Sequence, residues 1–223
     1  MNRMTGLFIG LGAILLLVVF AVLWPDVEDG LEQVEALMEN RTLNTFYLLC
    51  GIVAFTMMQS GLILLSRQLI GQVSGAHAQW LTVANIGFMI SVAVMYASTG
   101  LDAGAMELYA GGNPDQAALL NIVGVHIGNA VWPWAFGGGM FVLGWASVSG
   151  ALKPKSGADW LPGLLVIPGA LFILAPFVNT EGWWFGGWIV MTLSLIIVGG
   201  AKALGVPRRP IKRPTHQLQS LIV

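Results

Sequence analysis

The residues best suited to chemistry lie together in one apolar stretch, residues 118–150. This stretch contains no charged residue, and it holds an imidazole (His126), an amide (Asn129) and two indoles (Trp132 and Trp134) around a proline. His126 and Asn129 are three positions apart, so on a helix they share a face. A single imidazole in apolar surroundings can ligate a pigment or a haem, or donate a hydrogen bond to a quinone. We therefore predict a ligand-binding group of His126, Asn129, Trp132 and Trp134.

A structural role for His126 stays open beside this prediction. A neutral imidazole inside a membrane helix can bond to a neighbouring helix or to a backbone carbonyl. His77 and His216 fall in a turn and in the tail, so no second histidine is available for a bis-histidine haem. Cys50 is the only cysteine, which excludes an internal disulfide and a cysteine-based metal site. We expect no metal site and assign no catalytic residue.

The composition is typical of a membrane protein. Hydrophobic residues make up 56% of the chain and charged residues only 9%, against roughly 25% charged residues in a soluble domain. Lipid solvates neither charges nor unpaired backbone groups, so a chain in the bilayer needs few charges and backbone groups that are paired within it. The length of the apolar runs favours helices, and we predict an all-α polytopic membrane protein.

Six apolar stretches are long enough to cross a bilayer, which requires about 20 helical residues. They are residues 5–24, 45–66, 80–99, 118–150, 160–178 and 183–204. We predict a single six-helix transmembrane domain over residues 1–204, followed by a basic, Pro-rich cytoplasmic tail over residues 205–223.

Two connecting segments carry most of the acidic residues. Residues 26–43 place Val27, Leu31, Val34, Leu37 and Met38 at helical spacing between acidic side chains, which predicts a short amphipathic surface helix. It either packs as a connector or forms a docking surface for a basic partner. Residues 100–117 are rich in glycine and predict a loop. We expect its three carboxylates to be solvated, and the alternative is that the loop folds inward and brings them toward His126. The three carboxylates are those of Asp102, Glu107 and Asp115.

The charges predict the orientation of the chain. With six spans and the N-terminus in the cytoplasm, ten of the eleven acidic residues fall outside and nine of the ten basic residues fall inside. The inner basic residues are Arg3, Arg67, Lys153, Lys155, Lys202, Arg208, Arg209, Lys212 and Arg213. Cytoplasmic loops are enriched in Lys and Arg, so both termini are predicted to be cytoplasmic.

Polar and small residues inside the predicted spans indicate helix packing. Gln59 and Asn85 are predicted to form hydrogen bonds between helices, and Gly6 and Gly10 form a face that lets another helix approach closely. No acidic residue lies in the centre of a span, so a proton- or sodium-coupled carrier lacks its usual charged relay.

Two neighbouring motifs resemble a known family. Residues 141–154 read FVLGWASVSGALKP, with a Gly-Trp pair near a helix end, and residues 160–174 read WLPGLLVIPGALFIL, with a proline at the next helix start. This region is similar to a family of small polytopic bacterial membrane proteins of unknown function, and the similarity covers about half of the chain, from the second to the fifth span. The resemblance implies a bacterial cytoplasmic (inner) membrane and the same helix count, and it implies no activity.

Three hypotheses for function follow from the sequence. The first is a non-catalytic subunit or accessory protein of a larger membrane complex, with membrane lipids and other membrane protein chains as partners. The second is a binder or carrier of a small hydrophobic molecule (a lipid, quinone or pigment) around the fourth span. The third is a membrane enzyme, for which no paired acid and base are visible. The short basic tail gives no support for nucleic-acid binding, because its positive charges are explained more simply by the orientation of the chain in the membrane and by contact with anionic lipid.

Overall fold

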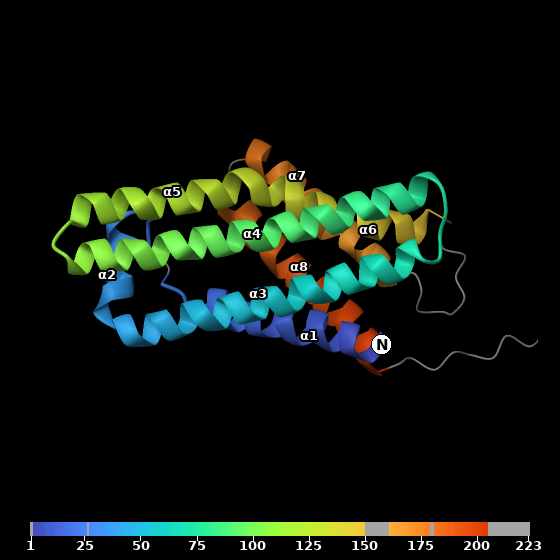
Figure 1. Cartoon of the computed structure of the whole chain (residues 1–223), viewed down its shortest axis with the longest axis horizontal. Helices are drawn as coiled ribbons and strands as arrows, with labels where there is room; N and C mark the ends of the chain where they lie inside the picture. Colours follow the sequence, from blue (N-terminus) through green and yellow to red (C-terminus); the bar gives the residue numbers. More distant parts are fainter. Residues whose placement is uncertain (1, 26, 150–160, 179–180, 205–223) are drawn as a thin grey trace, which may run out of the picture.

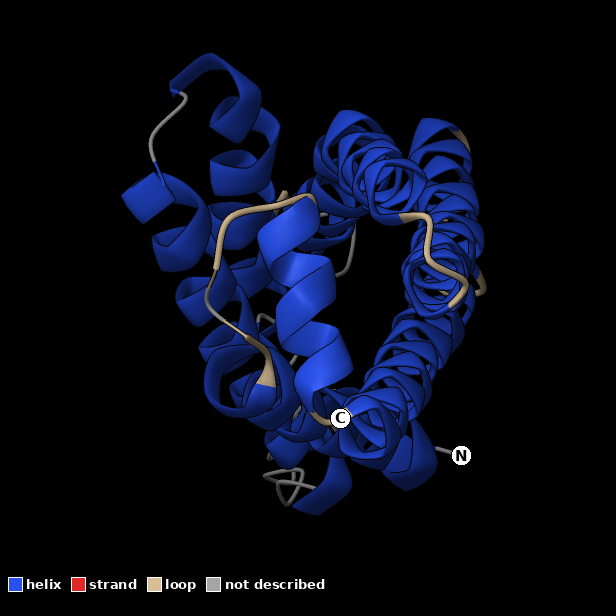
Figure 2. Ribbon diagram, turned by 90° about the vertical axis from the view of Figure 1, so that its left-hand side faces the viewer, coloured by secondary structure: helices blue, strands red, loops and turns tan. Residues whose placement is uncertain are grey.

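The computed structural model describes residues 2–25, 27–149, 161–178 and 181–204. Within these residues every regular element is a helix and there is no strand, as Figures 1 and 2 show, so the all-α prediction is confirmed. The predicted tail, residues 205–223, and the basic turn, residues 151–159, lie outside the described residues.

The helices follow one another with short connections. The first is α1 (Asn2–Val18), which continues as the π-helical segment η1 (Val19–Leu23). It is followed by α2 (Leu31–Glu39), α3 (Arg41–Ile70), α4 (Ala76–Ala110) and α5 (Pro114–Trp132). The π-helical segment η2 (Pro133–Gly137) joins α5 to α6 (Gly138–Val148). A 3-10 turn η3 (Leu161–Leu165) then leads into α7 (Val166–Val178) and α8 (Glu181–Leu204).

Five of these helical stretches are long and apolar enough to cross a membrane. They are 3–23, 41–70, 76–110, 161–178 and 185–204. The predicted fourth span corresponds to α5, η2 and α6, where the π-helical turn begins at Pro133. Proline lacks the backbone N–H that a regular helix needs at this position, so the hydrogen-bond ladder is interrupted there.

The prediction of a loop over residues 100–117 is wrong. Helix α4 continues to Ala110, a turn with Gly112 at φ 79° follows, and α5 begins at Pro114. No proline interrupts the chain between Ala76 and Asn113, and buried contacts of Ala105 and Met106 hold the last turns of α4 in place. Tertiary packing therefore outweighs the weak helix propensity of the glycines.

The predicted surface helix is present but shorter than residues 26–43. In α2, Val34 is fully buried in a cluster with Ala105 of α4 and Ala117 of α5, and Leu37 is fully buried against α3 and α4. The preceding Val27 is exposed. Figure 2 shows α2 lying across the end of the bundle that faces the viewer. Of the two expected roles, the contacts match the packed connector.

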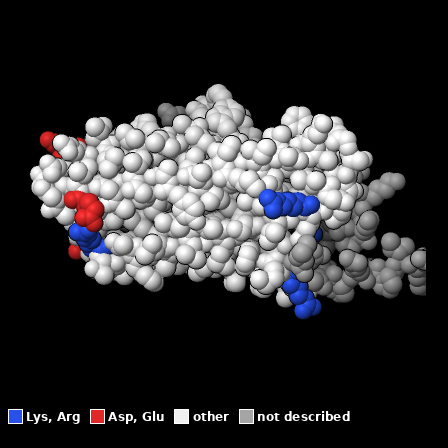
Figure 3. All heavy atoms as spheres, in the orientation of Figure 1, with Lys and Arg blue, Asp and Glu red and all other residues white. Residues whose placement is uncertain are grey.

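The two ends of the bundle carry opposite charge (Figure 3). We call the end with α2 and the α4–α5 turn the acidic end. Its described acidic residues include Asp29, Glu32, Glu35, Glu39, Glu107 and Asp115. The opposite end, with the N-terminus of α1 and the C-terminus of α8, is the basic end, and its described basic residues are Arg3, Arg67 and Lys202. Between the ends, the face in Figure 3 is uncharged.

Glycines set the closest helix contacts. A Cβ placed on Gly199 of α8 would lie 2.7 Å from the Cα of Gly10 and 2.8 Å from the backbone oxygen of Gly6, so α1 and α8 touch backbone to backbone. Gly6 and Gly10 are the small-residue face predicted from the sequence. A Cβ placed on Gly169 of α7 would lie 2.8 Å from the backbone oxygen of Gly137, so these two segments are also in close contact. These contacts leave no space between the helices that they join.

Candidate functional site

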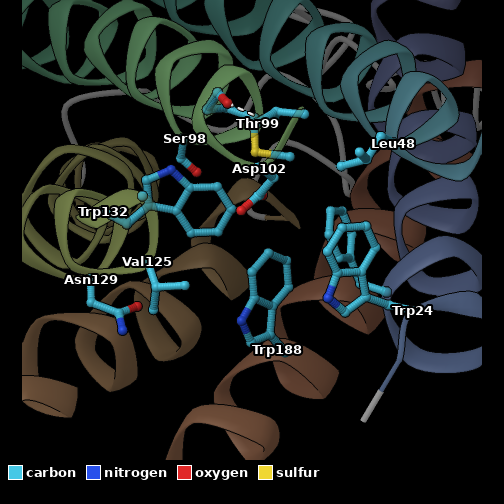
Figure 4. Close-up of a pocket in the computed structure, with 13 residues that line it drawn as sticks. Trp24, Leu48, Ser98, Thr99, Asp102, Val125, Asn129, Trp132 and Trp188 are labelled. Carbon is cyan, nitrogen blue, oxygen red and sulfur yellow. Dashed lines mark hydrogen bonds between the residues drawn. The ribbon is translucent and has the colours of Figure 1, made fainter. Parts of the chain in front are cut away.

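A cavity of about 200 Å³ lies in the half of the bundle nearer the acidic end. Five helical segments meet around it, namely α1 with η1, α3, α4, α5 and α8 (Figure 4). Its lining residues are Phe20, Trp24, Leu48, Met95, Ser98, Thr99, Asp102, Gly124, Val125, Gly128, Asn129, Trp132 and Trp188. We call it the aromatic cavity.

Four aromatic rings form a continuous wall of the aromatic cavity. Trp24 lies 5.6 Å from Phe20, Phe20 lies 6.4 Å from Trp188, and Trp188 lies 5.1 Å from Trp132, measured between ring centroids. Trp132 is also stacked on Phe55 of α3, with centroids 5.0 Å apart. Such ring pairs contribute about 0.5–1.5 kcal/mol each beyond their area burial, so the wall is held in position before any ligand binds.

Asp102 provides the carboxylate of the cavity. In Figure 4 its side chain points from α4 into the space between Trp132, Trp188 and Trp24. One carboxylate oxygen, Oδ1, accepts a hydrogen bond of 2.9 Å from Nδ2 of Asn121 on α5. No described residue donates a hydrogen bond to the other oxygen. Asp102 is therefore oriented by Asn121 and keeps an acceptor free toward the cavity.

The buried amide of Asn121 also fixes the chain that leads into α2. Its Oδ1 accepts a hydrogen bond of 2.7 Å from the backbone N–H of Gly30. Gly30 has φ 99°, a conformation that favours glycine, and a Cβ placed there would lie 3.2 Å from the side chain of Ile122. One amide thus joins the carboxylate of α4 to the segment between η1 and α2.

Gln33 of α2 extends this network. With the amide oriented to satisfy its neighbours, its oxygen accepts from Nε1 of Trp24 at 2.9 Å, and its nitrogen donates to Oδ1 of Asn121 at 3.1 Å and to Oδ1 of Asp29 at 3.2 Å. We call Trp24, Asp29, Gln33, Asp102 and Asn121 the polar cluster. Because a buried indole N–H needs an acceptor, this cluster fixes the ring of Trp24 against the cavity.

The polar cluster holds two carboxyl groups, those of Asp29 and Asp102, and no basic side chain. Desolvation raises the pKa of the Asp29 carboxyl above its ordinary value, and the nearby His126 acts in the opposite direction. Arg41 pairs with Glu107 at the end of the bundle, and no other salt bridge is formed among the described residues. Asp102 therefore has no basic side chain as a counterion in the described part of the chain.

The predicted ligand-binding group is divided by the structure. Asn129 and Trp132 line the aromatic cavity, together with Gly124, Val125 and Gly128 of the same helix. His126 does not line it, because residue 126 falls on another side of α5. Its side chain is exposed, and Nδ1 lies 2.8 Å from the backbone oxygen of Ile122.

Trp134 also lies away from the cavity. Its side chain is exposed and packs edge-on against Phe177 of α7, with ring centroids 6.0 Å apart. The π-helical turn that starts at Pro133 turns residues 133–137 away from the register of α5. Residues two positions apart on a helix point in different directions, and Trp132 and Trp134 accordingly have different surroundings.

The two predicted helix-contact residues differ as well. Asn85 of α4 donates hydrogen bonds to the backbone oxygen of Ile63 at 3.1 Å and to Oγ of Ser66 at 2.6 Å, both on α3. Gln59 is fully buried, and neither its amide nitrogen nor its amide oxygen has a hydrogen-bond partner among the described residues. Of these two amides, only that of Asn85 forms a hydrogen bond between helices among the described residues.

Sequence reasoning missed the polar cluster. The sequence predicts a solvated loop around Asp102, and it indicates no role for Asn121 or Gln33. The signal for Asp102 was the unbroken helical pattern of Leu101, Ala105 and Leu108 around it. Nothing in the local sequence indicates that Asn121 faces Asp102, since that pairing depends on how α4 and α5 pack.

The described residues contain no group of three or more His, Cys, Asp or Glu side chains that could hold a metal ion. The candidate site is therefore one cavity with an aromatic wall and one oriented carboxylate. Comparison with protein-family models, with curated proteins and with solved structures finds no match to this chain, so its resemblance to a family of bacterial membrane proteins stays a prediction.

Proposed function

We propose that the protein is a bacterial inner-membrane protein that crosses the bilayer six times with both termini in the cytoplasm. Five helical stretches that meet the length and hydropathy of spans support this topology, and the segment from α5 through η2 to α6 supplies the sixth. The opposite charges of the two ends support the orientation, because the basic end then faces the cytoplasm.

We propose that its function is to bind a small molecule in the aromatic cavity. The observation that carries this proposal is the cavity itself, which combines about 200 Å³ of space with four aromatic rings and the oriented carboxylate of Asp102. Ligand sites are typically apolar concavities with a few well-placed polar groups. The volume is below the roughly 300–1,000 Å³ of pockets for drug-sized ligands, so the ligand is small or is one group of a larger molecule.

The depth of the cavity indicates the side from which the ligand comes. The hydrocarbon core corresponds to about 20 helical residues. If the hydrocarbon core begins at Trp80, near the basic end of α4, then about 20 residues of α4 reach Gly100. Asp102 follows two residues later. The carboxylate then lies at the outer boundary of the hydrocarbon core, within reach of the outer leaflet and of the external solution.

Gly128 offers a direct test of this proposal. It lines the cavity, and a Cβ added there would have no heavy atom within 4 Å, so Gly128→Leu fills the cavity without a clash at its base. Gly100 is the matched control, because it is an exposed helical glycine that also has open space around its Cα. Native mass spectrometry of the mildly solubilised protein would measure the retained small molecules.

We expect wild type and Gly100→Leu to retain the same small molecule near one per chain, and Gly128→Leu to lose it. Equal retention by all three proteins, or no retained molecule in wild type, would contradict the proposal. The same spectra test the alternative that the protein is a non-catalytic subunit of a larger membrane complex, since that alternative requires stably bound partner chains. A retained pigment or quinone would appear in the absorbance spectrum.

A further inference from the structure

We propose that the ligand of the aromatic cavity is an organic ammonium ion, either a free amine or quaternary amine or the ammonium headgroup of a lipid. This inference rests on the proposed function and specifies the chemical class of its ligand. It follows from two features of the same cavity: a carboxylate without a counterion, and a wall of aromatic rings.

The carboxylate requires a positive partner. Ionisable residues near the membrane core are costly unless they are paired, and a single one that faces a cavity indicates a ligand or an ion. Asp102 faces the cavity, one of its oxygens accepts from Asn121, and no described residue donates to the other. The one described basic side chain that forms a salt bridge, Arg41, is bound to Glu107 instead. A cationic ligand would supply the missing counterion.

The aromatic wall selects the kind of cation. The faces of indole and benzene rings carry negative charge density and attract cations within about 6 Å, and Trp is the most effective of them. Three of the four rings in the wall are indoles, from Trp24, Trp132 and Trp188. A small inorganic ion would lose its hydration shell here without enough oxygen ligands to replace it, whereas an alkylated ammonium group is only weakly hydrated and fits between rings.

The rings and the carboxylate are positioned relative to each other before binding. Trp24 is fixed through Gln33, Gln33 contacts Asn121, and Asn121 orients Asp102. Trp132 is fixed from the other side by its stacking on Phe55. A preorganised site avoids the cost of ordering these side chains on binding.

Choline and its uncharged analogue 3,3-dimethyl-1-butanol provide the test, because they have nearly the same shape and differ in charge. Their binding to the full-length protein in a maltoside detergent, which contains no ammonium group, would be measured by isothermal titration calorimetry and by tryptophan fluorescence. Asp102→Asn removes the charge and keeps an oxygen for the hydrogen bond from Asn121. Asp115→Asn is the control, since Asp115 is an exposed carboxylate outside the cavity. Circular dichroism melts would establish that each variant is folded.

We expect wild type and Asp115→Asn to bind choline with equal affinity. The affinity of Asp102→Asn should be lower by on the order of tenfold or more, which is the contribution of one charge-assisted contact. The uncharged analogue should bind wild type weaker than choline by a similar factor. Equal binding of both compounds with no effect of Asp102→Asn would overturn the ammonium inference and leave the proposed function standing. If folded wild type does not bind choline, the ammonium inference is also overturned. The proposed function is then tested separately, by comparing the small molecules that wild type and Gly128→Leu retain.

A competition experiment distinguishes the two sources of the ammonium group. Short-chain phosphatidylethanolamine carries an ammonium headgroup, and short-chain phosphatidylglycerol does not. If the former displaces choline and the latter does not, a lipid headgroup occupies the cavity. If neither displaces choline, the ligand is a free ammonium ion. Both results support the ammonium class, whereas equal displacement by both lipids would contradict it.

Discussion

Near the basic end, α1 and α8 approach so closely that Gly10 and Gly199 touch through their backbones, whereas near the acidic end the same two helices contribute Phe20 and Trp188 to the wall of a cavity. The helix pair is the same, but the size of its residues changes along its length. Small residues bring the helices together at one end, and large rings keep them apart at the other. The space that results is lined by these rings together with Trp24 and Trp132.

Polar groups link helices in both halves of the bundle. Toward the basic end, Asn85 of α4 donates hydrogen bonds to Ile63 and Ser66 of α3. At the acidic end, hydrogen bonds link three segments through Asn121, Gln33 and Asp102. In the middle of the bundle, a fully buried amide, Gln59, has no partner among the described residues. The hydrogen bonds of the polar cluster hold the segments around the cavity in position, whereas Gln59 contributes no hydrogen bond to the bundle among the described residues.

The largest expected effect is at Gly199. A β-branched side chain there would collide with the backbone of α1, since a Cβ alone would lie 2.7 Å from the Cα of Gly10. Overpacking of this kind costs about 1–3 kcal/mol and occasionally more. We expect Gly199→Val to lower the free energy of unfolding by at least about 2 kcal/mol, measured as thermal stability in detergent.

Gly200 is the matched control for this variant. It is the next residue of α8, and a Cβ there would meet no heavy atom within 4 Å. Gly200→Val should be close to neutral. Equal destabilisation by the two variants would show that helix propensity decides the effect, and that the contact of α1 with α8 is not close.

A smaller effect is expected at Asn121, which joins the polar cluster. Asn121→Ala removes the acceptor of the Gly30 N–H and the donor to Asp102, and each buried polar group left unpaired costs about 1–3 kcal/mol. We expect a loss of stability of about 1–3 kcal/mol together with faster hydrogen exchange of the backbone amides of residues 27–30. Unchanged exchange in that segment would show that Asn121 does not hold it.

The smallest effect is expected at Gln59. Both of its polar atoms are buried without a partner among the described residues, so Gln59→Leu removes a desolvation cost and no hydrogen bond. The change should be neutral or slightly stabilising in a thermal melt. Asn85→Leu, which breaks two hydrogen bonds to α3, should cost about 0.6–1.7 kcal/mol. A larger loss at Gln59 than at Asn85 would contradict this ranking.

The sequence predicts the helical class and the approximate position of most helices, because long apolar runs with few charges leave few alternatives. It also predicts the close approach at Gly6 and Gly10 and two residues of the cavity, Asn129 and Trp132. These features depend on local composition or on residues a few positions apart.

The rest of the site depends on contacts between distant segments. Asp102 and Asn121 are 19 positions apart, and Gly30 and Asn121 are 91 positions apart. No local pattern indicates these pairings. Trp134 packs against Phe177 of α7 and not in the cavity, and the predicted ligand His126 bonds to its own helix. Tertiary packing therefore decides which polar residues face the cavity.

Thiol accessibility tests most directly whether the aromatic cavity in the acidic half of the bundle admits a small ligand. In a Cys50→Ala background, Ser98→Cys would place a thiol in the wall of the aromatic cavity, and Ser147→Cys would place one in a buried position of α6 near the basic end. We expect a small water-soluble methanethiosulfonate reagent to label Ser98→Cys and not Ser147→Cys, and choline to slow the labelling of Ser98→Cys. Equal labelling of the two thiols, or no labelling at Ser98→Cys, would contradict a ligand-accessible cavity in the acidic half of the bundle.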